Sequence, residues 1–191
     1  MTVQLILASA SPRRKELLDQ IQVTYRIYPV DLDETPLPDE TPLDYVQRLA
    51  AEKSAACLAQ LNTGTPVLAA DTAVVLGAVI MGKPRDRADA LSMLTQLSGK
   101  THRVYSAISL RGREHHQAVS ITEVTFRHLT AQEMLAYWHG GEPVDKAGAY
   151  AIQGMGGVFV ESIKGSFSGV VGLPLFETAE LLSRQGIELF K

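Results

Sequence analysis

The chain has 191 residues, a formal net charge of −3, 46% hydrophobic residues and a single cysteine, Cys57. This length and hydrophobic content suffice for one domain over residues 1–191, and one cysteine excludes a disulfide framework or a Cys/His zinc cluster and suits a reducing, cytoplasmic location. The acidic balance argues against nucleic-acid binding, which needs a basic surface. The opening hydrophobic run, Val3–Ala8, is too short to span a membrane, so we expect a first strand and no membrane partner.

Hydrophobic runs and turn residues predict strands alternating with helices. Strands are predicted at Val3–Ala8, Val23–Val30, Val67–Val75, Arg103–Leu110, Val119–Phe126, Val158–Ile163 and Gly169–Gly172. Helices are predicted over Thr41–Leu61, from Asp86 to near Gly99, after a capping box of Thr130 and Glu133, and from Pro174 to near Gly186. Hairpins predicted at Gly112–Arg113 and Lys164–Gly165 then indicate an α/β fold with a mixed sheet.

Positive charge follows the first strand, in the segment Ser9-Ala10-Ser11-Pro12-Arg13-Arg14-Lys15. Ser11 is placed to cap a helix whose first position is Pro12. Three cations at the positive end of a helix dipole are each disfavoured by about 0.3–1 kcal/mol, so we expect an anion there. Free backbone N–H groups, a serine hydroxyl and the guanidinium groups of Arg13 and Arg14 together predict a phosphate site. The alternative is a solvated first turn with arginines paired to surface carboxylates.

Two lysines are candidates for the same anion. Lys53 falls on the buried stripe predicted for the helix Thr41–Leu61, a stripe defined by Val46, Leu49, Ala50 and Cys57. Because a buried ammonium is costly without an anion, either its stem carries the charge to the rim or the charge points into a polar cleft. Lys83 stands just before a predicted helix in a loop that Pro84 stiffens, and alone it would be an unremarkable surface residue.

Carboxylates interrupt or follow predicted strands. Asp71 lies inside the hydrophobic run Val67–Val75, where a charged carboxylate must be paired, hydrogen-bonded or metal-bound. Its alternative role is that of a structural partner for an arginine. Asp33 and Glu34 follow the second predicted strand and become ligand candidates for Mg²⁺ or Mn²⁺ only together with Asp71.

Other catalytic chemistries lack their signatures. The sequence contains neither a GxxxxGK[ST] loop nor a kinase-like glycine loop. Ser9, Ser11 and Ser106 lack a GxSxG context, and His115 and His116 are predicted to lie in a solvent-exposed turn. These observations exclude serine hydrolysis and favour phosphoryl chemistry.

Eight segments stand in order along nearly the whole chain. They are LILASASPRRKELL at the start, DLDET at 31–35, AAEKSAA around Lys53, AADTAVV around Asp71, GKPRD at 82–86, LSGKTHRVYSA at 97–107, DKAGAYAIQG at 145–154 and VVGLPL at 170–175. This set resembles the Maf family of nucleotide pyrophosphatases. The resemblance implies an elongated, mixed and twisted sheet flanked by helices, with two lobes around a central cleft as in Maf and ITPase-like proteins, and often a homodimer. It also implies cleavage between the α and β phosphates that depends on a divalent metal cation such as Mg²⁺ or Mn²⁺.

Within that family, the branch that acts on dTTP and UTP carries arginine after Ser-Pro, threonine after the catalytic aspartate, and glutamine in the GAYxIQG segment. Arg13, Thr72 and Gln153 fill these places. The resemblance therefore implies a cytoplasmic enzyme that hydrolyses dTTP and UTP, or modified pyrimidine nucleotides, to the monophosphate and pyrophosphate. The Gln153 amide can pair with the O4 and N3–H edge shared by uracil and thymine.

The resulting hypothesis assigns a role to each candidate. Asp71, Glu34, Lys53 and Lys83 are the expected catalytic residues, with Asp71 as general base or metal ligand and Glu34 sharing the metal. Substrate binding is assigned to Ser9, Ser11, Arg13, Arg14, Thr72 and Gln153. The rival hypothesis is a non-catalytic nucleotide-binding regulator of growth or cell division, which would share the phosphate-binding residues but would need no ionised Asp71 beside a metal.

Overall fold

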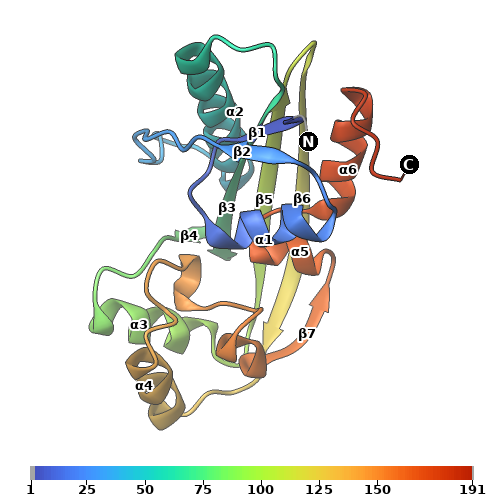
Figure 1. The fold of residues 1–191 in the computed structure, drawn as a ribbon. Helices are drawn as coiled ribbons and strands as arrows, with labels where there is room; N and C mark the ends of the chain where they lie inside the picture. Colours follow the sequence, from blue (N-terminus) through green and yellow to red (C-terminus); the bar gives the residue numbers. More distant parts are fainter. Residues whose placement is uncertain (1–2, 191) are drawn as a thin grey trace.

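The computed structural model describes residues 3–190, and a mixed sheet forms the centre of the molecule (Figure 1). Its strands in the described residues are β1 (Leu5–Leu7), β2 (Tyr25–Ile27), β3 (Val67–Leu76), β4 (Val79–Met81), β5 (Thr101–Arg111), β6 (His115–Phe126) and β7 (Val160–Lys164). The order across the sheet is β2-β1-β3-β5-β6-β7, and β4 pairs with β3. β1 is parallel to β2 and β3, whereas the other pairs are antiparallel. The expected mixed α/β sheet is confirmed.

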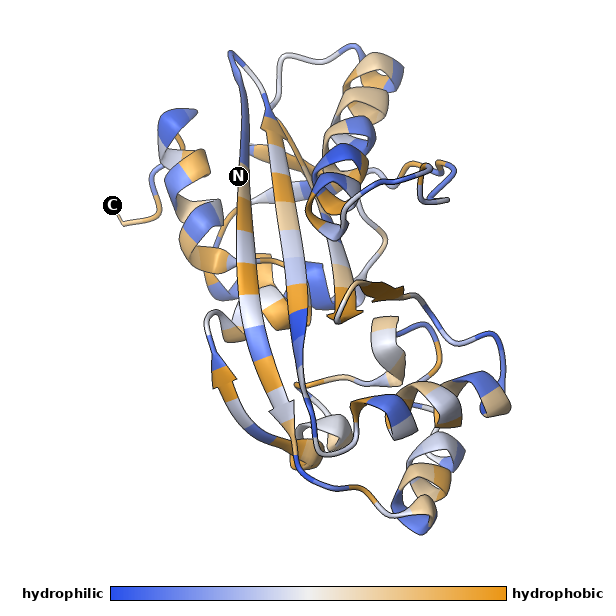
Figure 2. Cartoon of the chain, turned by 180° about the vertical axis from the view of Figure 1, so that it is seen from behind, coloured by the Kyte–Doolittle hydropathy of each residue, from blue (hydrophilic) through white to orange (hydrophobic). Residues whose placement is uncertain are grey.

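Helices flank this sheet on both faces. They are α1 (Pro12–Gln20), α2 (Pro42–Leu61), α3 (Arg87–Leu97), α4 (Ala131–His139), α5 (Phe167–Val171) and α6 (Leu175–Arg184), with short 3₁₀ helices η1 (Ala147–Ala149) and η2 (Met155–Phe159). Helix α2 packs against β3 and β5, while α5 and α6 pack against β5 and β6 from the opposite face. Figure 2 shows hydrophobic residues recurring along the central strands, where these layers meet. No helix within residues 3–190 is long and apolar enough to cross a membrane.

Alternating side chains along β3 divide the core into two layers. One layer, which includes leucines of α1 and α6, contains Leu68, Ala70 and Val74. The layers against α2 contain Val67, Ala69, Ala73 and Val75. Because successive side chains of a strand point to opposite faces, Asp71 belongs to the α2 face and Thr72 to the opposite face.

One edge of β3 has different partners at its two ends. β1 pairs with Val67 and Leu68, and β4 pairs with the stretch Val74–Leu76. Between these two contacts, no described strand pairs with this edge, whereas β5 runs along the other edge from Val67 to Val75. Asp71 and Thr72 lie inside this interval, so both can be reached from one opening despite pointing to opposite faces.

The long strands β5 and β6 connect two lobes (Figure 1). One lobe holds β1, β2, α1, α2 and α6, and the other holds α3, α4, β7 and the two 3₁₀ helices. The interval in β3 faces the space between the lobes. The two-lobed arrangement around a cleft that the resemblance implied is therefore present.

Two sequence predictions near the carboxyl end are wrong. The segment 169–172, predicted as a strand, is part of α5, because the Ser166 hydroxyl accepts a hydrogen bond from the Gly169 N–H at 3.0 Å and starts a helix that ends at Gly172 with φ 130°. Lys164–Gly165 forms no hairpin, because Gly165 leads from β7 into α5 and the antiparallel partner of β7 is β6, which precedes α4.

Further differences concern the middle of the chain. His115 and His116 lie at the start of β6 rather than in a turn, paired with Arg111 and Leu110 of β5, although His115 is exposed as expected. The short strand β4 escaped prediction. The predicted helix starts at Thr41, Asp86, Thr130 and Pro174 are all confirmed as N-cap positions.

Replacing the cap of α4 should destabilise the chain moderately. The Thr130 hydroxyl accepts from the Glu133 N–H at 3.2 Å, and the Glu133 carboxylate accepts from the Thr130 N–H at 2.8 Å. Thr130→Ala should lower the free energy of unfolding in urea by about 1 kcal/mol, because one N–H at the helix start loses its acceptor. Thr130→Ser keeps the acceptor and should remain close to the wild type. An equal loss in both variants would contradict the capping role.

Candidate active site

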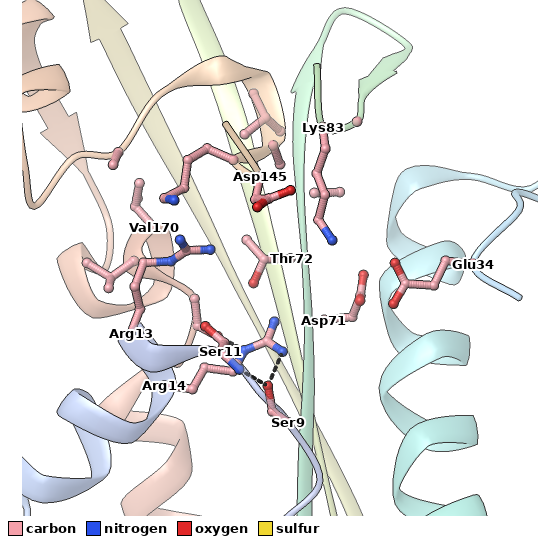
Figure 3. Close-up of a pocket in the computed structure, with 18 of the residues that line it drawn as sticks. Ser9, Ser11, Arg13, Arg14, Glu34, Asp71, Thr72, Lys83, Asp145 and Val170 are labelled. Atoms are coloured by element: carbon pink, nitrogen blue, oxygen red, sulfur yellow. Dashed lines mark hydrogen bonds between the residues drawn. The ribbon is translucent and has the colours of Figure 1, made fainter. Parts of the chain in front are cut away.

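A cavity of about 990 Å³ lies over the interval of β3 between β1 and β4. The candidate residues share this cavity as lining: Ser9, Ser11, Arg13, Arg14, Glu34, Lys53, Asp71, Thr72, Lys83 and Gln153. They come from segments far apart in the sequence and from both lobes (Figure 3). Asp33 does not line the cavity, and its carboxylate accepts the Thr35 N–H at 2.9 Å instead. The structure thus supports Glu34 and not Asp33 as the companion of Asp71.

A buried lysine joins two carboxylates on the α2 side of β3. Lys53 and Asp71 are only 8% and 7% exposed, and the lysine Nζ lies 2.8 Å from Asp71 Oδ1. The same Nζ lies 2.5 Å from Glu34 Oε1, whose side chain is about half exposed. The Lys53 ammonium therefore points into the cleft and does not extend to the rim. Of the two alternatives that the helical pattern left open, the structure shows the polar cleft.

The two carboxylates differ in proton affinity. Burial raises the pKa of Asp71, although the positive charges of Lys53 and Arg14 oppose the shift. Burial also works against ionisation of Glu34, but the hydrogen bond and charge of Lys53, with the charges of Lys83 and Arg14, outweigh it and lower the Glu34 pKa. Adjacent carboxyl groups with pKa values pushed apart are typical of acid–base sites. Asp71 is accordingly the stronger base of the pair.

Arg14 is held in place at the start of α1. Its Nε donates to the Gly172 carbonyl at 2.9 Å, and its Nη1 donates to the Ser9 hydroxyl at 3.2 Å (Figure 3). The Ser11 N–H donates to the same Ser9 oxygen at 3.2 Å. Ser11 occupies the N-cap position as predicted, but its side chain makes no capping hydrogen bond.

Both arginine side chains are partly shielded from solvent. Burial lowers the pKa of Arg14, with Asp71 and Glu34 acting in the opposite direction, and burial likewise lowers the pKa of Arg13. A cation that loses water is stabilised by an anion placed beside it. This environment favours the phosphate-site hypothesis over a solvated first turn.

Lys83 completes the positive side of the cavity. It is exposed in the loop between β4 and α3, and Figure 3 shows its side chain extending toward Asp71 and Glu34. Its charge contributes to the lowered pKa of Glu34. Lys83 is therefore part of the cleft and not an unrelated surface residue.

The chain is similar in sequence to known proteins along nearly its whole length. Residues 4–185 match the family described as Maf-like protein. The chain belongs to the Maf family. A relative from Myxococcus xanthus named dTTP/UTP pyrophosphatase is 54% identical over 97% of this chain and 94% of its own, and one of the same name from Methylococcus capsulatus is 52% identical over 97% and 92%. Among solved structures, the Staphylococcus aureus Ham1 protein shares 17% identity at a TM-score of 0.48, covering 64% of this chain and 71% of that chain.

Two further residues of this Maf protein line the cavity, although the sequence alone assigns them no role. Asp145 and Lys146 line the cavity from the second lobe, and Asp145 faces Arg13 (Figure 3). Asp145 adopts a left-handed backbone with φ 62°, a conformation that non-glycine residues rarely take and that often marks functional segments. Asp145 belongs to the DKAG segment of the family resemblance, but the sequence alone does not show that it faces Arg13.

The loop that carries Gln153 is anchored by a second network, which sequence reasoning missed. The Glu142 carboxylate accepts from the Met155 N–H and the Gly156 N–H, each at 2.9 Å, and from the Tyr137 hydroxyl at 2.7 Å. The Tyr137 oxygen in turn accepts the Ala151 N–H at 3.1 Å. These bonds tie both sides of the loop to α4 and the segment after it, and Gln153 remains exposed toward the cavity.

The donor set of this Maf site fits a hard divalent cation. The carboxylates of Glu34 and Asp71 both contact the Lys53 ammonium and would offer oxygen ligands, whereas no group of three or more His, Cys, Asp or Glu side chains is gathered for a metal in the described part of the chain. Mg²⁺ is commonly held by one or two carboxylates together with substrate phosphates, and not by an all-protein cage. Two carboxylates beside a phosphate site match that arrangement.

Removing the Glu142 charge should loosen the Gln153 loop without affecting the sheet. Hydrogen bonds to a charged group contribute about 1.5–3 kcal/mol, so hydrogen exchange at the Met155 and Gly156 amides should accelerate by about tenfold or more in Glu142→Gln. Tyr137→Phe is the matched variant: it should expose the Ala151 amide while Met155 and Gly156 stay protected. Uniform acceleration across β3 as well would contradict a local anchor.

Proposed function

We propose that this Maf protein hydrolyses dTTP and UTP to the monophosphate and pyrophosphate, with a divalent cation such as Mg²⁺ or Mn²⁺. The observation that carries the proposal is the buried Lys53–Asp71 pair at the floor of a cavity that also receives Arg13, Arg14 and Lys83. Relatives more than 50% identical over nearly the whole chain bear the name dTTP/UTP pyrophosphatase. A cavity of about 990 Å³ is also large enough for a nucleotide.

The cations position the triphosphate. Arg13, Arg14, Lys53 and Lys83 surround the region next to Asp71 and can offset the charge that develops on the leaving pyrophosphate. Arg14 is already fixed by Ser9 and Gly172, so its guanidinium reorganises little when substrate arrives. Such preorganised charge acts mainly on the transition state.

Asp71 acts as the general base. A water oxygen forms a bond to the α-phosphorus, the bond from that phosphorus to the bridging oxygen of the β-phosphate breaks, and Asp71 takes the water proton. Its burial-raised pKa makes it a better base than an ordinary aspartate, and the Lys53 charge counteracts that rise. Glu34 and Asp71 would hold the divalent cation, which would supply further positive charge and lower the pKa of a nearby water.

Base recognition is assigned to the second lobe. Gln153 is exposed on an anchored loop, where its amide offers one donor and one acceptor to the O4 and N3–H edge of uracil or thymine. Ordinary and modified pyrimidine nucleotides share this edge. A cytoplasmic location, the absence of nucleic-acid and membrane partners, and a homodimer remain predictions.

Asp71→Asn should abolish turnover and leave the fold intact. Loss of a general base typically lowers the rate by about 10² to 10⁴, so pyrophosphate release from dTTP and UTP in Mg²⁺ should fall by at least that factor, while ATP and GTP remain poor substrates for both forms. Chelation of the metal should stop the wild type. The control is Asp39→Asn, an exposed loop position outside the cavity where asparagine tolerates the left-handed backbone.

Each outcome separates the candidate functions. Near wild-type pyrophosphate release by Asp71→Asn would remove Asp71 from the mechanism. Release of orthophosphate alone would indicate a phosphatase. Tight nucleotide binding by the wild type without any turnover would favour the regulator.

A further inference from the structure

A row of hydroxyl groups crosses the sheet on the face opposite Asp71. Thr72 of β3 pairs in register with Ser106 of β5. The two side-chain oxygens lie 2.8 Å apart, and the Ser106 Oγ lies 2.6 Å from the main-chain oxygen of Gly169 in α5. Ser106 is completely buried, whereas Thr72 is half-buried and lines the cavity.

The direction of these hydrogen bonds is fixed by counting hydrogens. A carbonyl oxygen can only accept, so the single hydrogen of the Ser106 hydroxyl points to Gly169. The Ser106 oxygen must then accept from Thr72, because two hydroxyl oxygens 2.8 Å apart need one hydrogen between them. The hydrogen of Thr72 is thereby directed into the protein, and only lone pairs of its oxygen remain for the cavity.

This polarity restricts what can bind to Thr72. Ionised phosphate oxygens are hydrogen-bond acceptors, so their lone pairs would repel those of the Thr72 oxygen and no hydrogen bond could form. A nucleotide offers donors only from its nucleoside part, which are the imide N3–H of uracil or thymine and the hydroxyl groups of the sugar. Thr72 also lies on the opposite side of β3 from Asp71 and Glu34 (Figure 3). The group that contacts Thr72 therefore belongs to the nucleoside, while the scissile phosphate lies beside Asp71.

We propose that Ser106 is a positioning residue that fixes Thr72 as a hydrogen-bond acceptor, and that Thr72 thereby selects nucleotides which present a donor, either the base N3–H or a sugar hydroxyl. This inference rests on the proposed function. If the donor is N3–H, Thr72 and not the Gln153 carbonyl accepts that hydrogen, and cytosine is rejected because its N3 carries a lone pair and leaves the Thr72 acceptor unpaired. Discrimination of this kind does not require Ser106 to touch the ligand.

The test measures dissociation constants by calorimetry for the α,β-methylene analogues of UTP and CTP, which resist cleavage at the reacting bond. If Thr72 accepts from the base, Thr72 of Ser106→Ala can rotate and donate to cytosine N3, so the preference for the UTP analogue should fall by about tenfold. If Thr72 accepts from the sugar, the preference of Ser106→Ala for the α,β-methylene dTTP analogue over its 3′-deoxy derivative should fall instead. The control is Ser120→Ala, which removes a buried hydroxyl from the next position of the same row on β6 and should keep the wild-type preference.

A second variant separates base from sugar and leaves the buried serine untouched. Thr72→Val lacks the acceptor, and its binding is compared for the α,β-methylene dTTP analogue, the N3-methyl derivative and the 3′-deoxy derivative. If Thr72 accepts from the base, the variant should lose the preference of the wild type for the parent over the N3-methyl compound; if from the sugar, it should lose the preference over the 3′-deoxy compound.

The proposal is overturned if Ser106→Ala keeps both wild-type preferences, for the UTP over the CTP analogue and for the parent dTTP analogue over its 3′-deoxy derivative, or if Thr72→Val weakens all three dTTP analogues by one common factor. These readouts are binding constants, so they do not depend on turnover. Failure of the wild type to release pyrophosphate from dTTP or UTP would instead count against the proposed function.

Discussion

The contact between Lys53 and Asp71 is the interaction on which the site depends. An ionised carboxylate buried alone in a sheet would carry a penalty of several kcal/mol, and so would a buried ammonium. Each residue compensates the buried charge of the other, and the half-exposed Glu34 carboxylate also contacts the Lys53 ammonium. Removing Lys53 leaves two carboxylates without their shared cation, whereas removing the Asp71 charge leaves the ammonium paired with Glu34.

The interruption in the pairing of β3 gives this charge pair access to substrate. Along β3, the pairing with β1 ends at Leu68 and the pairing with β4 begins at Val74, so the residues between these two points open onto the cleft from both faces of the strand. Strand alternation then places Asp71 toward α2 and Thr72 toward α1 and α5. Asp71 and Thr72 can thus contact the scissile phosphate and the nucleoside from opposite sides of one strand, while Arg13 and Arg14 of α1 reach the phosphates from the Thr72 side.

Sequence reasoning succeeded where a residue contradicts its local pattern. Asp71 breaks a hydrophobic strand, Lys53 breaks a buried helical stripe, and Arg13 and Arg14 oppose a helix dipole; all four line the cavity. It failed where structure depends on distant contacts. The Gly169–Gly172 segment is predicted as a strand, but the Ser166 hydroxyl, which accepts the Gly169 N–H, caps a helix there. The bond between Ser106 and Gly169 joins residues 63 positions apart, and the Glu142 anchor has no periodic signature.

The most direct test of this account is a ¹³C-carboxyl NMR titration of Asp71 in the wild type and in Lys53→Met. Burial raises the pKa of Asp71 and the neighbouring ammonium opposes that rise, so the account predicts a higher Asp71 pKa in the variant than in the wild type. An Asp71 pKa that stays the same or falls when the ammonium is removed would contradict the claim that Lys53 maintains the ionised carboxylate.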